Sequence, residues 1–176
     1  GFVHTNTVTA SASDNEGNPA TANDSADVTL TNAPTLIEVV KTAAPIQVTE
    51  PGGNVTFTVQ VNNLTIEDVT LTSLSDDIFG DITTSGHDGI TTTDCATGGL
   101  IAGSGSYSCQ FTAFVGGDAG FLHIDTVTAV AVDNEGTEAT DSDSANVEVV
   151  NAAPEIQVIK TADPTSVPAP NATVSY

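Results

Sequence analysis

The first 45 residues of this chain recur near its other end. Residues 1–45 align without a gap to residues 120–164, and 26 of the 45 aligned positions are identical. Pairs such as His4 and His123, or Lys41 and Lys160, are separated by 119 positions. A period of this length is the size of a whole small domain and is much longer than the roughly 20 to 45 residues of a solenoid repeat. The sequence therefore predicts domains in tandem.

The same offset predicts the domain boundaries. We expect residues 1–34 to be the C-terminal strands of a preceding repeat, residues 35–153 to form a complete repeat, and residues 154–176 to be the first strands of the following one. Both junctions between repeats therefore fall inside the chain. We expect its function to reside at these junctions.

Within the complete repeat, apolar residues alternate with polar ones at the period of a β-strand. Phe57, Val59 and Val61 share one face of a predicted strand, and the same alternation runs through residues 107–115 and 124–132. Gly, Pro, Asn and Asp separate these runs, and helical periodicity is absent. With about seven such strands, the pattern predicts an all-β fold, an immunoglobulin-like β-sandwich, although the Trp of antibody domains is missing.

The order of the sequence motifs also resembles a known family. The segments IEVVKTAAP, EPGGNVTFTVQVNN, VTLTSLSDDIFGD, SYSCQFTAFV, DTVTAVAVDNEG and TDSDSANVEV follow one another. This succession is similar to the conserved repeat of unknown function found in very long bacterial and archaeal cell-surface proteins. The resemblance implies an immunoglobulin-like domain, a surface or secreted location and an architectural role. It implies no reaction.

Acidic side chains dominate the charge of the chain. Asp and Glu number 23 against 2 Lys, which gives a net charge of −21. A surface of this sign repels phosphates and anionic lipid headgroups, so we expect neither nucleic acid nor a membrane surface as a partner. No apolar run approaches the roughly 20 residues that cross a bilayer. Divalent cations are suitable partners, and an adaptation for solubility or high salt is the alternative.

The two cysteines predict a disulfide. Cys95 and Cys109 lie 14 positions apart in a region that reads as paired strands. An even number of cysteines in a chain of extracellular type favours a bridge between neighbouring strands. Two free buried thiols are the alternative.

Acidic turns are the candidate calcium sites. Calcium takes six to eight oxygen ligands, and the turn sequence Asp-Asn-Glu-Gly places several together in both copies of the repeat. We expect bound calcium to lock acidic domain ends in line, as in cadherin-like modules, whereas ordinary solvated turns are the alternative reading. The predicted ligands are Asp14, Asn15, Glu16, Asp24, Glu67, Asp68, Asp76, Asp77, Asp81, Asp133, Glu135, Asp141 and Asp143.

Lys41 lies on the core-facing side of its predicted strand, where an ammonium group needs a partner. One hypothesis is an intramolecular isopeptide bond to Asn146 or Asn151, catalysed by an acid such as Asp76. The simpler hypothesis, which the sequence favours, is that Lys41 extends to a carboxylate at the rim of the domain.

Glycosylation and catalysis have weaker signals. Asn-x-Ser/Thr triplets begin at Asn23, Asn54, Asn63 and Asn171, in predicted turns or near strand ends. No nucleophile elbow, zinc-binding helix motif or phosphate-binding loop is present, so we expect no enzyme activity.

The sequence therefore favours an extracellular structural protein, a stalk, sheath or filament with calcium-stabilised junctions. Its partners would be neighbouring repeats or other copies of the same protein, joined in part by strand addition between units. The alternative is an adhesin that binds a glycan or a host protein through the Gly-rich span from Ser85 to Ser106.

Overall fold

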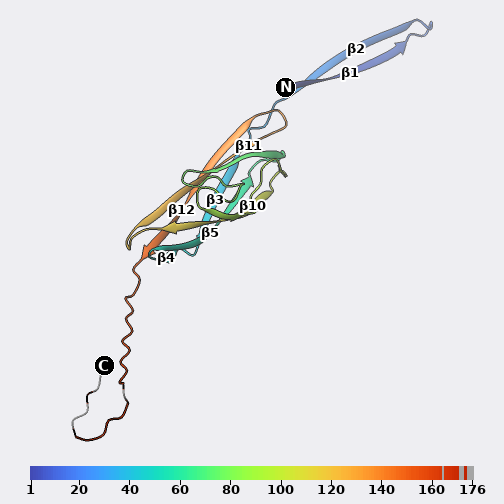
Figure 1. The fold of residues 1–176 in the computed structure, drawn as a ribbon. Helices are drawn as coiled ribbons and strands as arrows, with labels where there is room; N and C mark the ends of the chain where they lie inside the picture. The colour runs from blue at the N-terminus through green and yellow to red at the C-terminus, as the bar shows by residue number, and fades with distance from the viewer. Residues whose placement is uncertain (164, 171–172, 174–176) are drawn as a thin grey trace.

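The computed structural model of the chain describes residues 1–163, 165–170 and 173. Its regular elements are strands, and no helix occurs among the described residues. Figure 1 shows three parts: a hairpin at one end, a sandwich in the middle, and an extended segment after the last strand that leaves from the opposite end. The sandwich contains the buried core.

Two sheets face each other in the sandwich. The first has the strand order β3-β5-β10-β8, formed by β3 (Ile37–Ala44), β5 (Gly52–Asn63), β10 (Ser106–Gly116) and β8 (Ile90–Thr93). The second has the order β4-β12-β11-β6-β7, formed by β4 (Gln47–Thr49), β12 (Glu138–Val150), β11 (Leu122–Val132), β6 (Val69–Asp76) and β7 (Gly80–Asp81), with β9 (Leu100–Ile101) paired to β6. This is the strand order of an immunoglobulin-like sandwich, which confirms the predicted all-β sandwich.

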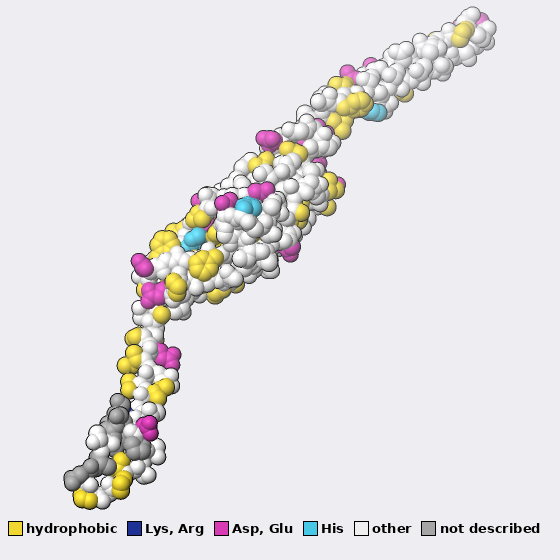
Figure 2. Space-filling view, viewed as in Figure 1, with side chains coloured by type: hydrophobic (Ala, Val, Ile, Leu, Met, Phe, Trp, Pro, Cys, Tyr) yellow, Lys and Arg dark blue, Asp and Glu magenta, His cyan; other side chains and the backbone are white. Residues whose placement is uncertain are grey.

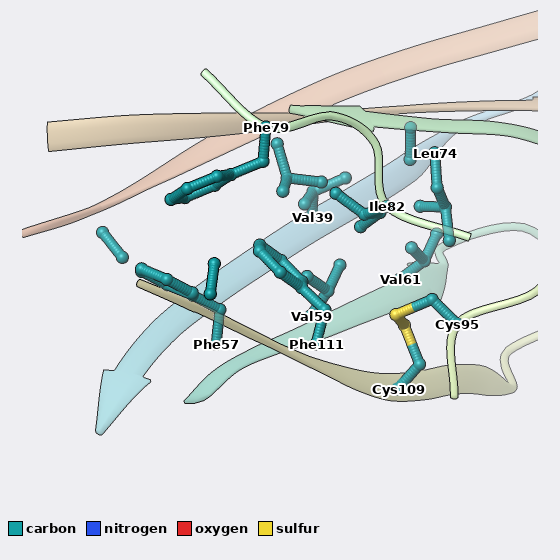
Figure 3. Close-up of a cluster of buried hydrophobic side chains, with 14 of the residues drawn as sticks. Val39, Phe57, Val59, Val61, Leu74, Phe79, Ile82, Cys95, Cys109 and Phe111 are labelled. Atoms are coloured by element: carbon teal, nitrogen blue, oxygen red, sulfur yellow. A yellow bond between two sulfur atoms is a disulfide. The ribbon is translucent and has the colours of Figure 1, made fainter. Parts of the chain in front are cut away.

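The core comes from the inward-facing residues of both sheets. Phe57 and Phe111 are directly opposite each other on β5 and β10, and their ring centroids lie 5.0 Å apart. Phe79 packs against both rings, at 5.8 and 5.9 Å, and Figure 3 shows these rings beside the smaller aliphatic side chains. The alternating residues expected to face the core, such as Val59 and Val61, are buried.

The hairpin of β1 (Phe2–Ser13) and β2 (Pro19–Leu30) forms a separate two-stranded sheet whose residues are all exposed. Its register repeats that of β11 and β12. His4 faces Val28 in the hairpin, and His123 faces Val147 in the sandwich. The turns also match, because Gly17 and Gly136 both adopt a positive φ, of 83° and 84°.

The sequence pattern missed the shortest strands and underestimated the last one. β4, β7 and β8 have two to four residues each, too few for alternation to be recognised. Apolar alternation in the sequence marks the last strand only over residues 145–150, whereas β12 begins at Glu138. The reason is that Asp141 and Asp143 occupy inward-leaning positions where an apolar residue is usual.

Candidate functional site

The acidic turn of each hairpin is shaped by its first carboxylate. Asp133 Oδ1 accepts hydrogen bonds from the backbone N–H groups of Glu135 and Thr137, at 2.9 and 2.7 Å. Asp14 Oδ1 accepts the equivalent bonds from Glu16 and Asn18, and the Asn18 side chain lowers the pKa of Asp14 further. This side-chain turn explains the repeated Asp-Asn-Glu-Gly sequence without a metal ion.

Asp133 also binds the segment that joins the hairpin β1–β2 to the sandwich. The Thr35 hydroxyl donates to Asp133 Oδ2 at 2.7 Å, and Asn32 Nδ2 donates to the same oxygen at 3.4 Å and to the Thr137 hydroxyl at 2.9 Å. The bond from Thr35 is the main cause that holds the pKa of Asp133 well below its ordinary value. The connection is thus tied to the turn between β11 and β12.

Three predicted calcium ligands meet at this end of the sandwich. Oxygens of Glu67, Asp133 and Glu135 all lie within 4.8 Å of one another. Asp68, on the same rim, accepts a hydrogen bond from the backbone N–H of Gly103. The residues that line a shallow pocket here include Glu67, Asp68 and Asp133. This acidic rim, defined as Glu67, Asp133 and Glu135, contains oxygen ligands of the kind that calcium prefers.

Most other predicted ligands bind nearby backbone groups. Asp141 and Asp143 accept hydrogen bonds from the backbone of β3 at 2.7 and 2.8 Å. Asp77 accepts from the N–H of Thr126 at 2.7 Å. Asp24 accepts a hydrogen bond from the N–H of Ser25. Asp81 accepts one from the Thr83 hydroxyl, which is the main cause that lowers the pKa of Asp81. Asn15 donates to the neighbouring Glu16.

Asp76 lies in the core, not in a loop at the end of the sandwich as the calcium hypothesis required. Its Oδ1 accepts hydrogen bonds from the backbone N–H groups of Ile78 and Phe79, at 2.9 and 3.0 Å. Its Oδ2 accepts one from Lys41 Nζ at 2.6 Å. Because the side chain has no exposed surface and contacts the Lys41 ammonium in the core, Asp76 is not available to a calcium ion at the domain end.

Lys41 does not reach the rim of the domain. Its side chain is fully buried, and Nζ lies 2.6 Å from both Asp76 Oδ2 and Asp125 Oδ2. Nζ also lies 4.7 Å from the centroid of the Phe57 ring. His123 Nε2 is 3.7 Å from Asp125 Oδ2. The buried cluster, defined as Lys41, Asp76 and Asp125, therefore joins β3 of one sheet to β6 and β11 of the other.

The structure corrects the partner expected for Lys41. Asn146 and Asn151 are exposed, whereas the carboxyl group of Asp125 is completely buried. Burial is the main cause that raises the pKa of Asp125, and the nearby ammonium of Lys41 opposes it. Alternation along residues 124–132 could have revealed Asp125, because it shares the inward face with Val127 and Ala129.

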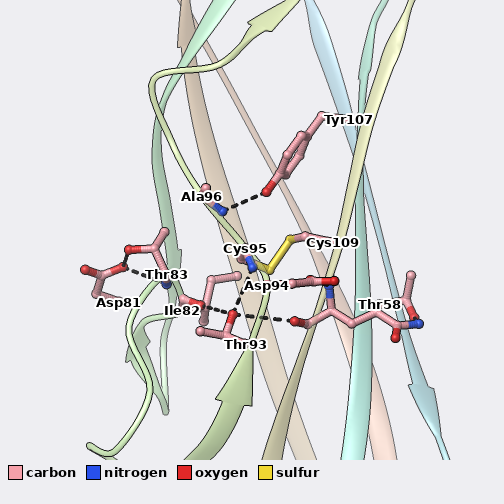
Figure 4. The surroundings of a disulfide bond; sticks show 11 residues. Thr58, Asp81, Ile82, Thr83, Thr93, Asp94, Cys95, Ala96, Tyr107 and Cys109 are labelled. Atoms are coloured by element: carbon pink, nitrogen blue, oxygen red, sulfur yellow. Dashed lines mark hydrogen bonds between the residues drawn. A yellow bond between two sulfur atoms is a disulfide. The ribbon is translucent and has the colours of Figure 1, made fainter.

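The predicted disulfide is confirmed. Cys95 follows β8 and is bonded to Cys109 on the adjacent strand β10, with the two Cα atoms 4.9 Å apart. Figure 4 shows how the segment around Cys95 is held: the Tyr107 hydroxyl accepts a hydrogen bond from the N–H of Ala96, and the Thr93 hydroxyl accepts one from the N–H of Cys95. The bridge fixes the edge of the first sheet.

The predicted glycosylation sites differ in accessibility. Asn63 is only 2% exposed, and its Nδ2, the atom to which a glycan is attached, donates to the carbonyls of Glu67, Ile101 and Ala102. Asn63 is therefore a structural residue, contrary to the expectation. Asn23 and Asn54 are exposed. Asn171 lies outside the described residues.

The surface carries the charge expected from the composition. Figure 2 shows acidic side chains spread along the visible face, on which no Lys or Arg appears. No helix of the described residues has the length and apolar character needed to span a membrane.

Comparisons with known proteins add little to this geometry. No family model matches the chain, and no curated protein matches it. A similar solved structure is the ASH / PapD-like domain 7 of human CEP192, which is 16% identical, with the match covering 70% of this chain and 92% of that one at a TM-score of 0.45. At this score the likeness carries no argument about function. The fold therefore rests on the strand order of this chain.

Proposed function

We propose that this chain is an architectural part of a secreted or cell-surface protein in which β-sandwich units follow one another in tandem. The observation that carries the proposal is the hairpin β1–β2. It has the sequence of β11–β12 with an offset of 119 residues, and it has the same strand register. The hairpin would be the last two strands of a preceding sandwich.

The exposed apolar side chains of the hairpin support this assignment. Val8 and Val28 correspond to Val127 and Val147, which are fully buried between the two sheets. In the hairpin the same positions are 68% and 61% exposed. Burying two valines contributes about 1.5–3 kcal/mol each, so this face is strongly favoured to be covered by the remaining strands of a sandwich.

The connections at the two ends favour an extended arrangement. The hairpin and the segment after β12 leave the sandwich at opposite ends (Figure 1), so units joined through them would form a stalk, sheath or filament. The bonds from Asn32 and Thr35 to Asp133 support a defined orientation at the first junction. A disulfide is typical of proteins that work in an oxidising, extracellular compartment.

Calcium at the acidic rim is a second part of the proposal. Glu67, Asp133 and Glu135 lie where the connection from the hairpin enters the sandwich, close to Thr35. A calcium ion at this position would offset two of the three negative charges and would stiffen the junction. Further oxygen ligands would come from water or from the preceding unit.

A lengthened variant, in which residues 35–119 are duplicated at the N-terminus, tests the tandem arrangement. Residues 35–119 placed directly before residue 1 would supply the missing strands and form a complete sandwich with the hairpin β1–β2. We expect backbone amides of Val8 and Val28 to become protected from hydrogen exchange, and small-angle scattering to show an elongated particle with two units. The 176-residue chain is the control. Persistent rapid exchange in the hairpin of a folded variant would contradict the proposal.

The adhesin alternative has less support. The span from Ser85 to Ser106 contains no Phe, Tyr or Trp, the residues that most often anchor sugars and proteins. Much of this span is instead committed to the sandwich through β8, β9 and the disulfide.

A further inference from the structure

The buried cluster contains one amine and two carboxyl groups that are completely shielded from solvent. Lys41 Nζ lies 2.6 Å from an oxygen of Asp76 and 2.6 Å from an oxygen of Asp125, and all three side chains have no exposed surface. Rings of Phe57 and Phe111 lie over Nζ, with centroids at 4.7 and 5.6 Å. Such a site holds reactive groups together and excludes water.

The charges of the cluster do not balance if both carboxyl groups are ionised. Two carboxylates and one ammonium would leave a net negative charge in the core, which is costly, and a proton retained on one carboxyl group would remove it. Asp76 is suited to be the ionised one, because two backbone N–H groups donate to its Oδ1. Neither oxygen of Asp125 has a hydrogen bond of good geometry among the described residues. Asp125 is therefore suited to be the protonated acid.

We propose that Lys41 Nζ and Asp125 Cγ become joined by an intramolecular isopeptide bond, with Asp76 as the catalytic acid and base. This inference concerns the chemistry of one folded sandwich. The geometry that carries it does not depend on the tandem arrangement or on calcium.

The reaction needs no external reagent. Ionised Asp76 takes a proton from the Lys41 ammonium, and the free amine attacks Cγ of the protonated Asp125 to give a tetrahedral intermediate. A C–N bond forms, Asp76 gives its proton to the departing hydroxyl group as the C–O bond breaks, and Asp76 takes up the second proton that leaves Nζ. The products are one amide, one water molecule and Asp76 in its protonated form. Fixing the reactants in contact supplies much of the rate enhancement.

The repeated sequence provides further support, which rests on the proposed tandem arrangement. The position equivalent to Asp125 is Asn6, and the position equivalent to Lys41 is Lys160. If this residue served only as the negatively charged partner of a lysine, asparagine at the same position could not fill that role. Asp and Asn share instead a side-chain acyl carbon that an amine can attack, with water leaving from Asp and ammonia from Asn. The alternation between these two residues favours bond formation over an ion pair.

The bond would connect the two sheets covalently. Lys41 is on β3 at the edge of one sheet, and Asp125 is on β11 in the middle of the other. The disulfide, in contrast, joins neighbouring segments of the first sheet. An isopeptide bond would therefore prevent the sheets from separating after the disulfide is reduced.

Intact mass spectrometry of the reduced, denatured 176-residue chain tests the proposal. We expect a mass lower than that of the sequence by one water molecule. The variant Lys160→Arg should show the same loss, whereas Lys41→Arg should have its full mass. Trypsin should cleave the denatured wild-type chain after Lys160 but not after Lys41. A wild-type chain of full mass that is cleaved at both lysines would overturn the proposal.

Variants of the two carboxyl groups assign their roles. Asp125→Asn should lose ammonia in place of water and give the same cross-linked product, and Asp125→Ala should have its full mass. Asp76→Asn should abolish or greatly slow the reaction, and circular dichroism would verify that each variant is folded. A branched peptide in which Lys41 is joined to Asp125, identified by tandem mass spectrometry, would support the assignment. A branch at Asp76 would overturn it.

Discussion

The carboxylate of Asp143 accepts a hydrogen bond of 2.8 Å from the backbone N–H of Lys41. Asp143 is on β12 of the second sheet, and Lys41 is on β3, the edge strand of the first. Asp141 makes the same contact with Val39, two residues away on each strand. The two carboxylates thus close one side of the sandwich, where β3 approaches the part of β12 that β4 does not cover, without pairing through their backbones.

We expect Asp143→Ala to destabilise the sandwich by about 1–3 kcal/mol, because it leaves a partly buried N–H group without its charged acceptor. Asp24→Ala is the matched control. Asp24 holds the equivalent position in the hairpin and accepts from the N–H of Ser25 within the same hairpin, so its loss should have little effect on the sandwich. Urea unfolding of both variants measures the difference. Equal stability of the two variants would contradict this role of Asp143.

Reduction of the disulfide should lower the free energy of unfolding by about 3 kcal/mol, the value expected for a loop of this length. The double variant Cys95→Ala, Cys109→Ala should lose a similar amount and should no longer respond to reductant. Denaturant titrations with and without reductant give both values. If reduction left the unfolding midpoint unchanged, the segment around Cys95 would be held by its hydrogen bonds alone.

The contribution of ionised Asp133 to the free energy of unfolding should disappear in acid. Hydrogen bonding, first of all from Thr35, holds its pKa below the ordinary value of 3.8, so the folded chain binds a proton less readily than the unfolded chain. Its stabilising effect is therefore complete above the unfolded-state pKa and is lost as the pH falls below about 4. We expect Asp133→Asn to be less stable than the wild type near neutral pH, with a difference that shrinks in acid. A difference that is independent of pH would argue against an ionised Asp133 as the source of the effect.

Calcium should raise the melting temperature if it binds the acidic rim. At a free concentration of 100 times the dissociation constant, binding stabilises the folded state by about 2.7 kcal/mol. Glu135→Gln should weaken this response, whereas the control Glu16→Gln, at the equivalent position of the hairpin, should retain it. Differential scanning calorimetry with calcium and with chelator makes the comparison. Identical melting curves for the wild type in both conditions would exclude a calcium-stabilised rim.

The strands with regular alternation were the easiest part to predict. Phe57, Val59 and Val61 face the core as expected, because β-strand geometry places every second residue on the same face. The short strand β4 was not predicted, since its pairing with β12 depends on how the two sheets are stacked. Asn63 was interpreted as a glycosylation site because the triplet records only local sequence, whereas its burial results from contacts with residues 38 and 39 positions away.

The sequence by itself determined the all-β sandwich, the disulfide between Cys95 and Cys109, and the similarity of the two hairpins, because alternation, spacing and identity are all properties of the linear chain. Only the tertiary structure decided which acidic residues are alike in function. Asp76 and Asp77 are neighbours in sequence, yet one is buried against Lys41 and the other is exposed and binds the backbone of Thr126. Stacking of the two sheets brings Lys41, Asp76 and Asp125 into contact across 84 residues of chain, and no local pattern encodes that distance.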